Sequence, residues 1–176
     1  SDYKFFLKKQ KKKIEIVKKD HPFYNINEIK FRFLRDKYLK KEDYFEIVKR
    51  LYIKHKFNYK KEMKNIFLKT SHLKKLSKSG HIIGLHSHSH PTDISTLPIK
   101  KQKDEYSLNK KILEKIIKKK IIVSAHPCGK YDSNTLKILK KLGIILGFGS
   151  KLKKDKKYLS TYNKNLIIPR EDHANL

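Results

Sequence analysis

The sequence predicts an α/β fold in which parallel strands alternate with helices. From residue 71 onward, short apolar runs alternate with longer stretches whose apolar residues recur every three or four positions. The first pattern is typical of buried strands and the second of amphipathic helices. Their alternation implies parallel strands joined by crossover helices. With 176 residues, of which 38% are apolar, the chain is long enough for one domain over residues 1–176 with a packed core.

The first 70 residues are predicted to be mainly helical. Residues 4–13 show a short helical pattern with an apolar edge, and the run Ile-Glu-Ile-Val at 14–17 indicates a short strand. Irregular chain around Pro22 separates this part from a basic helical stretch over residues 30–70. We interpret that stretch as a helical insertion. One apolar face repeats within it at helical spacing, formed by Tyr44, Ile47, Val48, Leu51 and Tyr52.

Residues 71–150 contain the regular part of the fold. Helices are predicted over residues 71–80, 102–119 and 132–143. The first is expected to end at Gly80, because glycine readily takes the left-handed conformation of a helix cap. The second is expected to turn inward the residues Leu108, Ile112, Leu113, Ile116 and Ile117. Strands are predicted over residues 81–87, 120–127 and 144–150. Asp93 and Asp132 are expected to serve as turn or cap residues.

The chain carries a formal net charge of +28, from 45 lysines and arginines against 17 acidic residues. Such an excess is compatible with a surface for nucleic acids or anionic glycans. However, only four of these cations are arginine, the side chain that best reads phosphates and bases through its planar fork. We therefore favour a general enrichment in lysine, and no nucleic-acid partner is expected.

Composition also limits the classes of protein to which the chain can belong. A run of 18 apolar residues is absent, so no transmembrane segment is expected. No charged-then-apolar signal segment is visible in this chain, and we leave its localisation open between the cytoplasm and the envelope. Cys128 is the single cysteine, which rules out disulfides within the chain and a zinc site made of cysteines. It is either a nucleophile or a small buried residue.

Three histidines alternate with two serines at residues 86–90, directly after the core of a predicted strand. Ligands gather at the carboxyl ends of parallel strands, and imidazole is a common ligand of zinc and other divalent metals. His86 and His88, two apart on an extended strand, would point to one face. His86 and His90 would instead place one ligand at the strand end and one on the following turn. Either pair needs a third ligand, and a solvated polar loop is the alternative.

Three segments resemble the polysaccharide deacetylase family, the NodB-homology domains similar to carbohydrate esterase family 4. Residues 73–97 resemble its second motif, in which A-x-G-H-E-I-G leads to H-[ST]-x-x-H-P. The matching positions are Gly80, His81, Ile83, Gly84, His86, Ser87, Ser89, His90 and Pro91. Residues 123–144 resemble the block F-A-Y-P-Y-G-x-Y, although His126 and Cys128 replace its aromatic residues. Residues 166–176 resemble L-P-R-I-D-x-x-D-L at Pro169, Arg170 and Asp172.

The resemblance implies a distorted or partial (β/α) barrel of the NodB type, with the helical insertion near residues 30–70. The family's first strand and its T-F-D-D-G motif are not visible, and we expect them upstream of the chain. Asp2 is a candidate remnant of that motif and hence the catalytic base. His86 and His90 are the implied ligands of a divalent metal, for which zinc is the first candidate. Further implied site residues are His173 as acid, Arg170 beside a carboxylate, and the substrate-binding residues Pro127, Cys128 and Gly129.

The function implied by the resemblance is the removal of an acetyl group from an N-acetylated or O-acetylated sugar of a polysaccharide or glycoconjugate. This would make the chain a metal-dependent hydrolase of a carbon–nitrogen bond other than a peptide bond, provided that the first motif is present upstream. Three alternatives remain open. They are an inactive or fragmentary homologue, a lysine-rich module that binds nucleic acids or anionic glycans, and a hydrolase that uses the H-x-H pair. Oligomeric state is left open.

Overall fold

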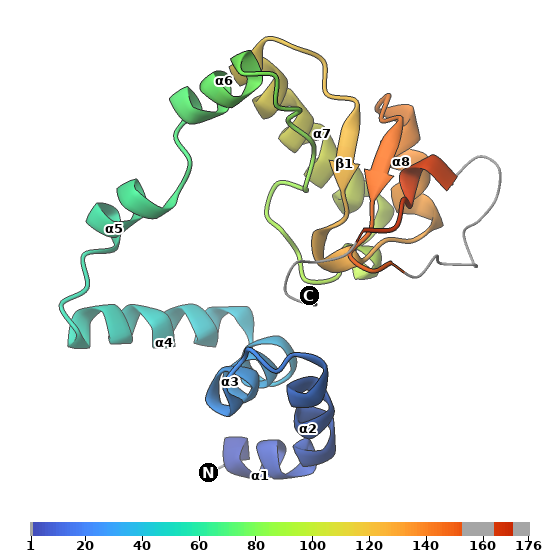
Figure 1. Ribbon diagram of the computed structural model, residues 1–176. Coiled ribbons are helices and arrows are strands. Elements are labelled where there is room, and N and C mark those ends of the chain that lie inside the picture. Colours follow the sequence, from blue (N-terminus) through green and yellow to red (C-terminus); the bar gives the residue numbers. More distant parts are fainter. Residues whose placement is uncertain (1, 153–163, 171–176) are drawn as a thin grey trace. The chain divides into compact units, whose positions relative to one another are not determined.

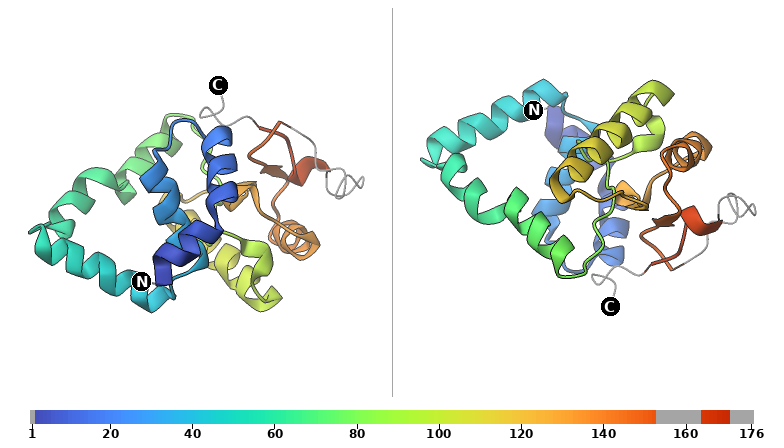
Figure 2. Two further views of the ribbon diagram at one scale, coloured as in Figure 1. Left: turned by 90° about the horizontal axis from the view of Figure 1, so that it is seen from below. Right: turned by 90° about the horizontal axis from the view of Figure 1, so that it is seen from above.

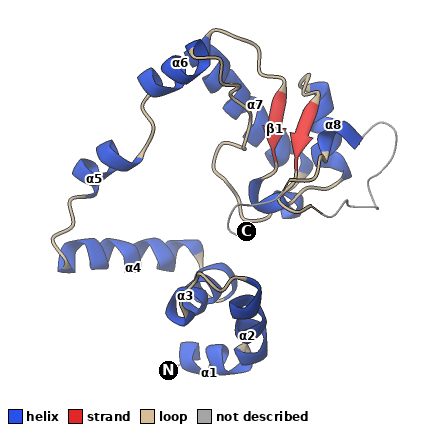
Figure 3. Ribbon diagram, viewed as in Figure 1, coloured by secondary structure: helices blue, strands red, loops and turns tan. Residues whose placement is uncertain are grey.

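The computed structural model describes residues 2–152 and 164–170, and these divide into two compact units (Figure 1). The first unit contains residues 2–67, and the second contains the described residues from 68 onward. Both named strands belong to the second unit (Figure 3). The boundary falls close to the end of the helical stretch predicted over residues 30–70, which is confirmed as helical. A single domain for the whole chain stays a prediction.

The first unit is built of helices joined by short connections. Its helices are α1 (Asp2–Lys9), α2 (Lys11–Asp20), α3 (Ile26–Lys37), α4 (Lys41–Lys54) and α5 (Tyr59–Ile66). Helices α1, α2 and α3 pack together and bury Ile14 and Ile29. Asn25 begins α3, because its side chain accepts hydrogen bonds from the backbone N–H groups of Asn27 and Glu28, both at 2.9 Å. The predicted apolar face of α4 stays largely exposed.

The strand predicted at residues 14–17 is wrong, because these residues lie within α2. Burial explains the error. Ile14 is 4% exposed and Val17 is partly buried, whereas Ile16 is 58% exposed. Residues three apart share a face of a helix, whereas residues two apart share a face of a strand. The flanking lysines are good helix formers, and a short apolar run of this kind is compatible with either structure.

The second unit contains the three predicted helices as α6 (Thr70–Lys78), α7 (Ile99–Ile117) and α8 (Ser133–Lys141). Short 3-10 turns are η1 (Ile94–Thr96), η2 (Pro127–Gly129) and η4 (Lys164–Leu166). Gly80 has a φ of +89°, and the N–H of His81 donates to the Leu76 carbonyl at 3.0 Å. This geometry confirms the left-handed cap expected at the end of α6.

Two of the predicted strands are present as β1 (Val123–Ala125) and β2 (Leu146–Phe148), which pair in parallel. The strand predicted over residues 81–87 is reduced to one parallel bridge, between Leu85 and Ser124. The chain turns away directly afterwards, because Ser87 adopts a left-handed backbone conformation with a φ of 59° and ends the extended pairing.

A second parallel bridge joins Phe148 to Ile168, so four parallel segments lie in the order Leu85, β1, β2 and Ile168. The residues that follow each segment therefore meet at one carboxyl edge. Helices α7 and α8 pack against each other, and the two views of Figure 2 show them on one side of the strands. This is the parallel α/β arrangement that the sequence predicts.

The core of the second unit lies between these helices and the strands. Its buried apolar residues are Leu85, Ile94, Tyr106, Ile121, Leu136, Ile138, Leu139, Ile144, Leu166 and Ile167. On α7 the predicted inward face is confirmed at Leu113 and Ile117, which pack against the core. It is wrong at Leu108 and Ile112, which are exposed, and it omits Tyr106, which is fully buried. Residues 106 and 113 lie seven positions apart, two helical turns on one face.

Two aspartates act as the caps that the sequence predicts. Asp93 precedes η1 and accepts a hydrogen bond from the N–H of Ser95 at 3.1 Å. Asp132 begins α8 and accepts from the N–H of Thr135 at 2.7 Å. Although burial alone would raise the pKa of Asp132, the hydrogen bonds from Thr135, Gln102 and Asn134 hold that pKa below its ordinary value. Both aspartates are therefore structural.

We predict that Gly147→Ala destabilises the second unit. An added Cβ would meet the carbonyl carbon of Leu166 at 2.8 Å, which is backbone and cannot rotate away. We expect the free energy of unfolding to fall by about 1–3 kcal/mol, measured by urea unfolding. Gly149→Ala is the matched control, because its Cβ would meet only the Ile168 carbonyl oxygen at 3.7 Å. Equal stability of the two variants would contradict the packing of η4 on β2.

Candidate functional site

The turn after Leu85 brings two histidine rings together. Within residues 86–90, Ser87 and His90 both have left-handed backbone conformations, with φ values of 59° and 52°. The ring centroids of His86 and His90 consequently lie 4.9 Å apart, with the ring planes inclined by 59°. Both residues are exposed, at the carboxyl edge of the parallel segments. The pair implied by the resemblance is therefore adjacent in the folded chain.

A backbone carbonyl fixes the orientation of His86. Its Nδ1 lies 2.9 Å from the carbonyl oxygen of Ala125, at the end of β1. A carbonyl oxygen can only accept, so Nδ1 must carry the proton and donate it. In the neutral ring this leaves the lone pair on Nε2, the atom that faces away from β1. Metal-binding histidines are commonly oriented through their other ring nitrogen in this way.

A carboxylate on α7 holds the middle of the same turn. The N–H groups of His88 and Ser89 donate to Glu105 Oε2 at 2.8 and 2.7 Å, and the hydroxyl of Ser89 donates to Oε1 at 2.7 Å. Partial burial alone would raise the pKa of Glu105, but these hydrogen bonds together with the nearby His88 hold the pKa below its ordinary value. Glu105 is therefore ionised at neutral pH.

Two further bonds complete the turn. Asn109, one helical turn after Glu105 on α7, accepts from the N–H of His86 through Oδ1 at 3.1 Å. The hydroxyl of Ser87 accepts from the N–H of His90 at 3.1 Å. Glu105 and Asn109 were not predicted from the sequence. Their signal is four-residue spacing, which places two polar residues on one face of a helix.

His126 lies buried beneath the site, at the end of β1. It is 1% exposed, its Nε2 lies 2.7 Å from the carbonyl oxygen of Leu166, and its ring packs on Tyr131 with centroids 4.4 Å apart. Nε2 is therefore the protonated nitrogen. Within the described part of the chain, its Nδ1 has no hydrogen-bond partner, and neither do the buried hydroxyls of Tyr106 and Ser124.

Burial lowers the pKa of His126 to about 4. The bond to Leu166 opposes this shift, and the electrostatic interaction with His86 adds to it. The ring is consequently neutral at pH 7. Burial also raises the pKa of Tyr106 above its ordinary value, so the phenol keeps its proton.

The predicted substrate-binding residues form η2, which follows β1 at the same carboxyl edge as His86. Pro127 is buried, whereas Cys128 is exposed and has a φ of 51°. Gly129 has a φ of 64°, and a Cβ there would collide with the side chain of Ser150. This turn therefore requires glycine at its third position. Contact of these residues with a substrate stays a prediction.

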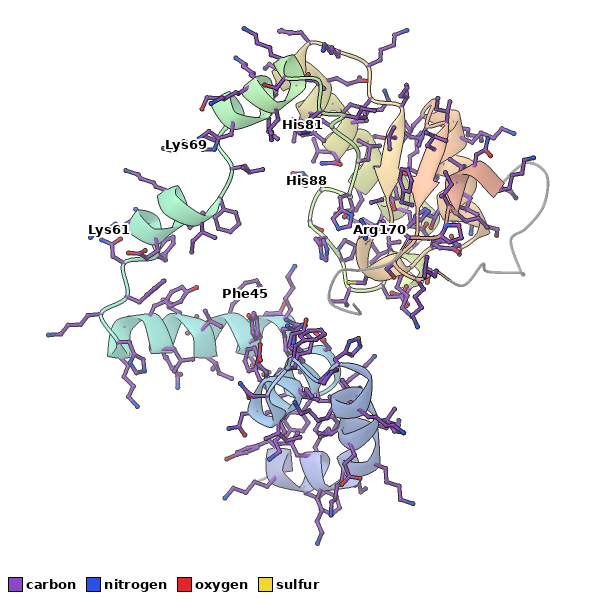
Figure 4. The ribbon with its side chains drawn as sticks, viewed as in Figure 1. Phe45, Lys61, Lys69, His81, His88 and Arg170 are labelled. Atoms are coloured by element: carbon purple, nitrogen blue, oxygen red, sulfur yellow. The ribbon has the colours of Figure 1, made fainter. Side chains whose placement is uncertain are left out.

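The predicted catalytic residues are placed as follows. Arg170 is exposed and lies two residues beyond Ile168, so it comes from the same edge of the sheet (Figure 4). Asp2 is exposed in the first turn of α1, in the other unit, rather than at the end of a strand. His173 lies outside the described residues. The catalytic roles of all three stay predictions.

Comparison with known proteins identifies the family. Residues 37–146, more than half of the chain, match the family model named polysaccharide deacetylase. The chain belongs to the polysaccharide deacetylase family. The matched range includes the turn of residues 86–90, α7 and β1, and it begins before α4. No curated protein matches the chain.

Solved structures of polysaccharide deacetylases share the fold. The Streptococcus pyogenes deacetylase PplD, solved in complex with acetate, is 26% identical with a TM-score of 0.52, over 59% of this chain and 44% of that one. The BpsB deacetylase domain from Bordetella bronchiseptica is 14% identical with a TM-score of 0.51, over 60% and 48%. A polysaccharide deacetylase from Bacillus cereus is 24% identical with a TM-score of 0.50, over 59% and 32%. Each match spans less than half of the solved chain, so the chain has a partial NodB-type fold.

The residues at the edge fit a divalent metal in part. Deacetylases of this family generally use one, and two exposed imidazoles that face each other, one of them with Nε2 free of the sheet, are suitable ligands. Within residues 2–152 and 164–170, no group of three histidine, cysteine or acidic side chains is arranged to hold an ion. In the same residues, none of the helices has the length and apolar character that crossing a membrane requires.

We predict that His126 makes stability depend on pH. Its pKa of about 4 in the folded state lies below the ordinary 6.5, so the unfolded chain takes up the proton first as pH falls. The contribution is fully present above pH 6.5 and is lost between pH 6.5 and about 4, on the order of 3 kcal/mol. Urea unfolding at several pH values tests this. His126→Gln, whose amide nitrogen is as many bonds from Cα as the imidazole Nε2 and can therefore still donate to Leu166, should lose correspondingly less stability over that range; equal losses would contradict the prediction.

Proposed function

We propose that this member of the polysaccharide deacetylase family is a metal-dependent hydrolase that removes an acetyl group from an N-acetylated or O-acetylated sugar of a polysaccharide or glycoconjugate. The observation that carries the proposal is the facing pair of His86 and His90, with ring centroids 4.9 Å apart at the carboxyl edge. Ligands bind at that edge in parallel α/β folds. The relative solved with acetate, PplD, is a deacetylase of similar fold.

The chain's own residues would divide the work by position. His86 and His90 would hold the cation, for which zinc is the first candidate because imidazole suits it. The carbonyl of Ala125 keeps the proton of His86 on Nδ1, so the ring presents its lone pair without first losing a proton. A divalent cation held there would supply the Lewis acid that polarises the acyl oxygen and lowers the pKa of a water molecule.

The remaining roles concern the substrate and the protons. We assign substrate contact to the turn of Pro127, Cys128 and Gly129, because it adjoins His86 at the end of β1. Attack on an acetamide also needs a base for the water proton and an acid for the departing amine. The resemblance assigns the base to the family's first motif, of which Asp2 is the candidate remnant, and the acid to His173, and Arg170 would orient a carboxylate through its planar fork.

We expect zinc binding to depend on two of the three histidines in the turn. His86→Ala and His90→Ala should each weaken zinc binding by at least about tenfold, or 1.4 kcal/mol, because each removes a ligand. His88→Ala is the matched control, two positions away from each ligand, and should leave the affinity unchanged. Isothermal titration of the purified chain with zinc chloride measures this. A loss in His88→Ala with none in His90→Ala would replace the proposed pair by the H-x-H pair.

Hydrolysis is tested separately from metal binding. Provided that the family's first motif is present, we expect the zinc-loaded protein to release acetate from oligomers of N-acetylglucosamine or from acetylated xylan, measured by an enzyme-coupled acetate assay. A chelator should abolish the release, and so should His86→Ala. Zinc binding without acetate release from either substrate would refute the hydrolase and leave an inactive homologue of the family.

A further inference from the structure

The turn that carries the two histidines is attached to α7 through one carboxylate. Three donors of the turn converge on Glu105: two successive backbone N–H groups, of His88 and Ser89, and the Ser89 hydroxyl, all at 2.7–2.8 Å. Both carboxylate oxygens are therefore occupied by the turn itself. Hydrogen bonds to an ionised acceptor are roughly twice as strong as those between neutral groups. This side chain is consequently the main anchor of the segment between His86 and His90.

Glu105 belongs to a part of α7 whose neighbouring residues are firmly packed. Tyr106, the next residue, is 0% exposed within the core, and Gln102, one turn earlier, is 1% exposed. The amide of Gln102 donates to the Leu97 carbonyl at 3.1 Å and accepts from the Thr135 hydroxyl at 2.6 Å, which ties α7 to α8. Glu105 therefore projects from a backbone that is fixed on both sides. Ligand geometry is best maintained from such supports.

The turn needs an anchor because its backbone is strained. Ser87 and His90 adopt left-handed conformations that cost non-glycine residues of order 1 kcal/mol or more each. Without a partner for the N–H groups of His88 and Ser89, an extended chain would relieve that strain and separate the two rings. The bonds to Glu105 hold the chain in the conformation that brings the rings together.

We propose that Glu105 is a positioning residue that locks the turn of residues 86–90, so that His86 and His90 face each other before any metal binds. The proposal rests on the proposed function for its metal-binding consequence. Asn109 supports the same turn at His86, through one bond rather than three. We assign Glu105 the role of holding the turn, because three donors of the turn engage its two oxygens.

Glu105→Gln tests the lock with little change in size. The glutamine amide keeps one oxygen acceptor, but its NH₂ group cannot accept from Ser89. Asp104→Asn is the matched control, since Asp104 is exposed, lies on the same helix, carries the same charge and makes none of the bonds to the turn. In the metal-free protein, amide hydrogen exchange of His88 and Ser89 should become roughly tenfold faster in Glu105→Gln and stay unchanged in the control.

Zinc affinity is the second measurement. We expect Glu105→Gln to bind zinc about 10- to 100-fold more weakly than the wild type, with the control unchanged. Thermal unfolding of both variants shows whether the fold is intact. If Glu105→Gln does not fold, Ser89→Ala replaces it, and this variant should show a smaller increase in exchange at residues 88–89 and a smaller loss of affinity, because it removes one bond of the three.

The outcomes separate the two proposals. Unchanged exchange at His88 and Ser89 in Glu105→Gln overturns the lock, whatever the metal affinity. Faster exchange with unchanged zinc affinity overturns the positioning role while the proposed function stands. If the wild type does not bind zinc, the proposed function fails, and hydrogen exchange alone then decides whether Glu105 locks the turn.

Discussion

Ala125 joins the histidine turn to the sheet through both of its backbone groups. Its N–H donates to the Leu85 carbonyl at 2.8 Å, and its own carbonyl accepts from His86 Nδ1 at 2.9 Å. The first bond sets the level at which the chain leaves the sheet, and the second sets the rotation of the imidazole. Since only a single bridge pairs this segment with β1, the site depends on very few backbone contacts. A shift of one residue in that pairing would turn His86 to the other face.

Helix α7 supports this arrangement by presenting two different surfaces. Tyr106 and Leu113 face the core, whereas Glu105 and Asn109 face the turn. The core contacts fix the helix, and the polar contacts transfer that rigidity to a segment that has little regular structure of its own. In this chain, the candidate site therefore depends on the crossover helix α7 as much as on the ends of the strands.

Sequence patterns predicted the helices of the second unit because their spacing and capping signals agree. Gly80 and Asp132, for example, each specify a local backbone geometry that does not depend on the rest of the fold. The prediction of a strand at residues 14–17 failed, because a four-residue apolar run is too short to distinguish the periodicity of a strand from that of a helix. Packing within α2 determined its structure. The pair of His86 and His90 could be predicted from motif spacing, whereas the convergence of two backbone N–H groups on Glu105 could not. That contact joins positions 16 or more residues apart. It also depends on the left-handed backbone conformations of Ser87 and His90, which no sequence pattern predicts.

The backbone of His90 has a further consequence. Glycine would occupy its left-handed conformation without a steric penalty, and asparagine would tolerate it well. His90→Gly would therefore stabilise the backbone of the turn but remove the imidazole. At this position, the residue that best fits the backbone is not the residue that can bind a metal. Stabilised sequences chosen for this backbone by conformational preference alone would tend to lose the histidine. Selection for thermal robustness and selection for a working site should thus favour different residues here.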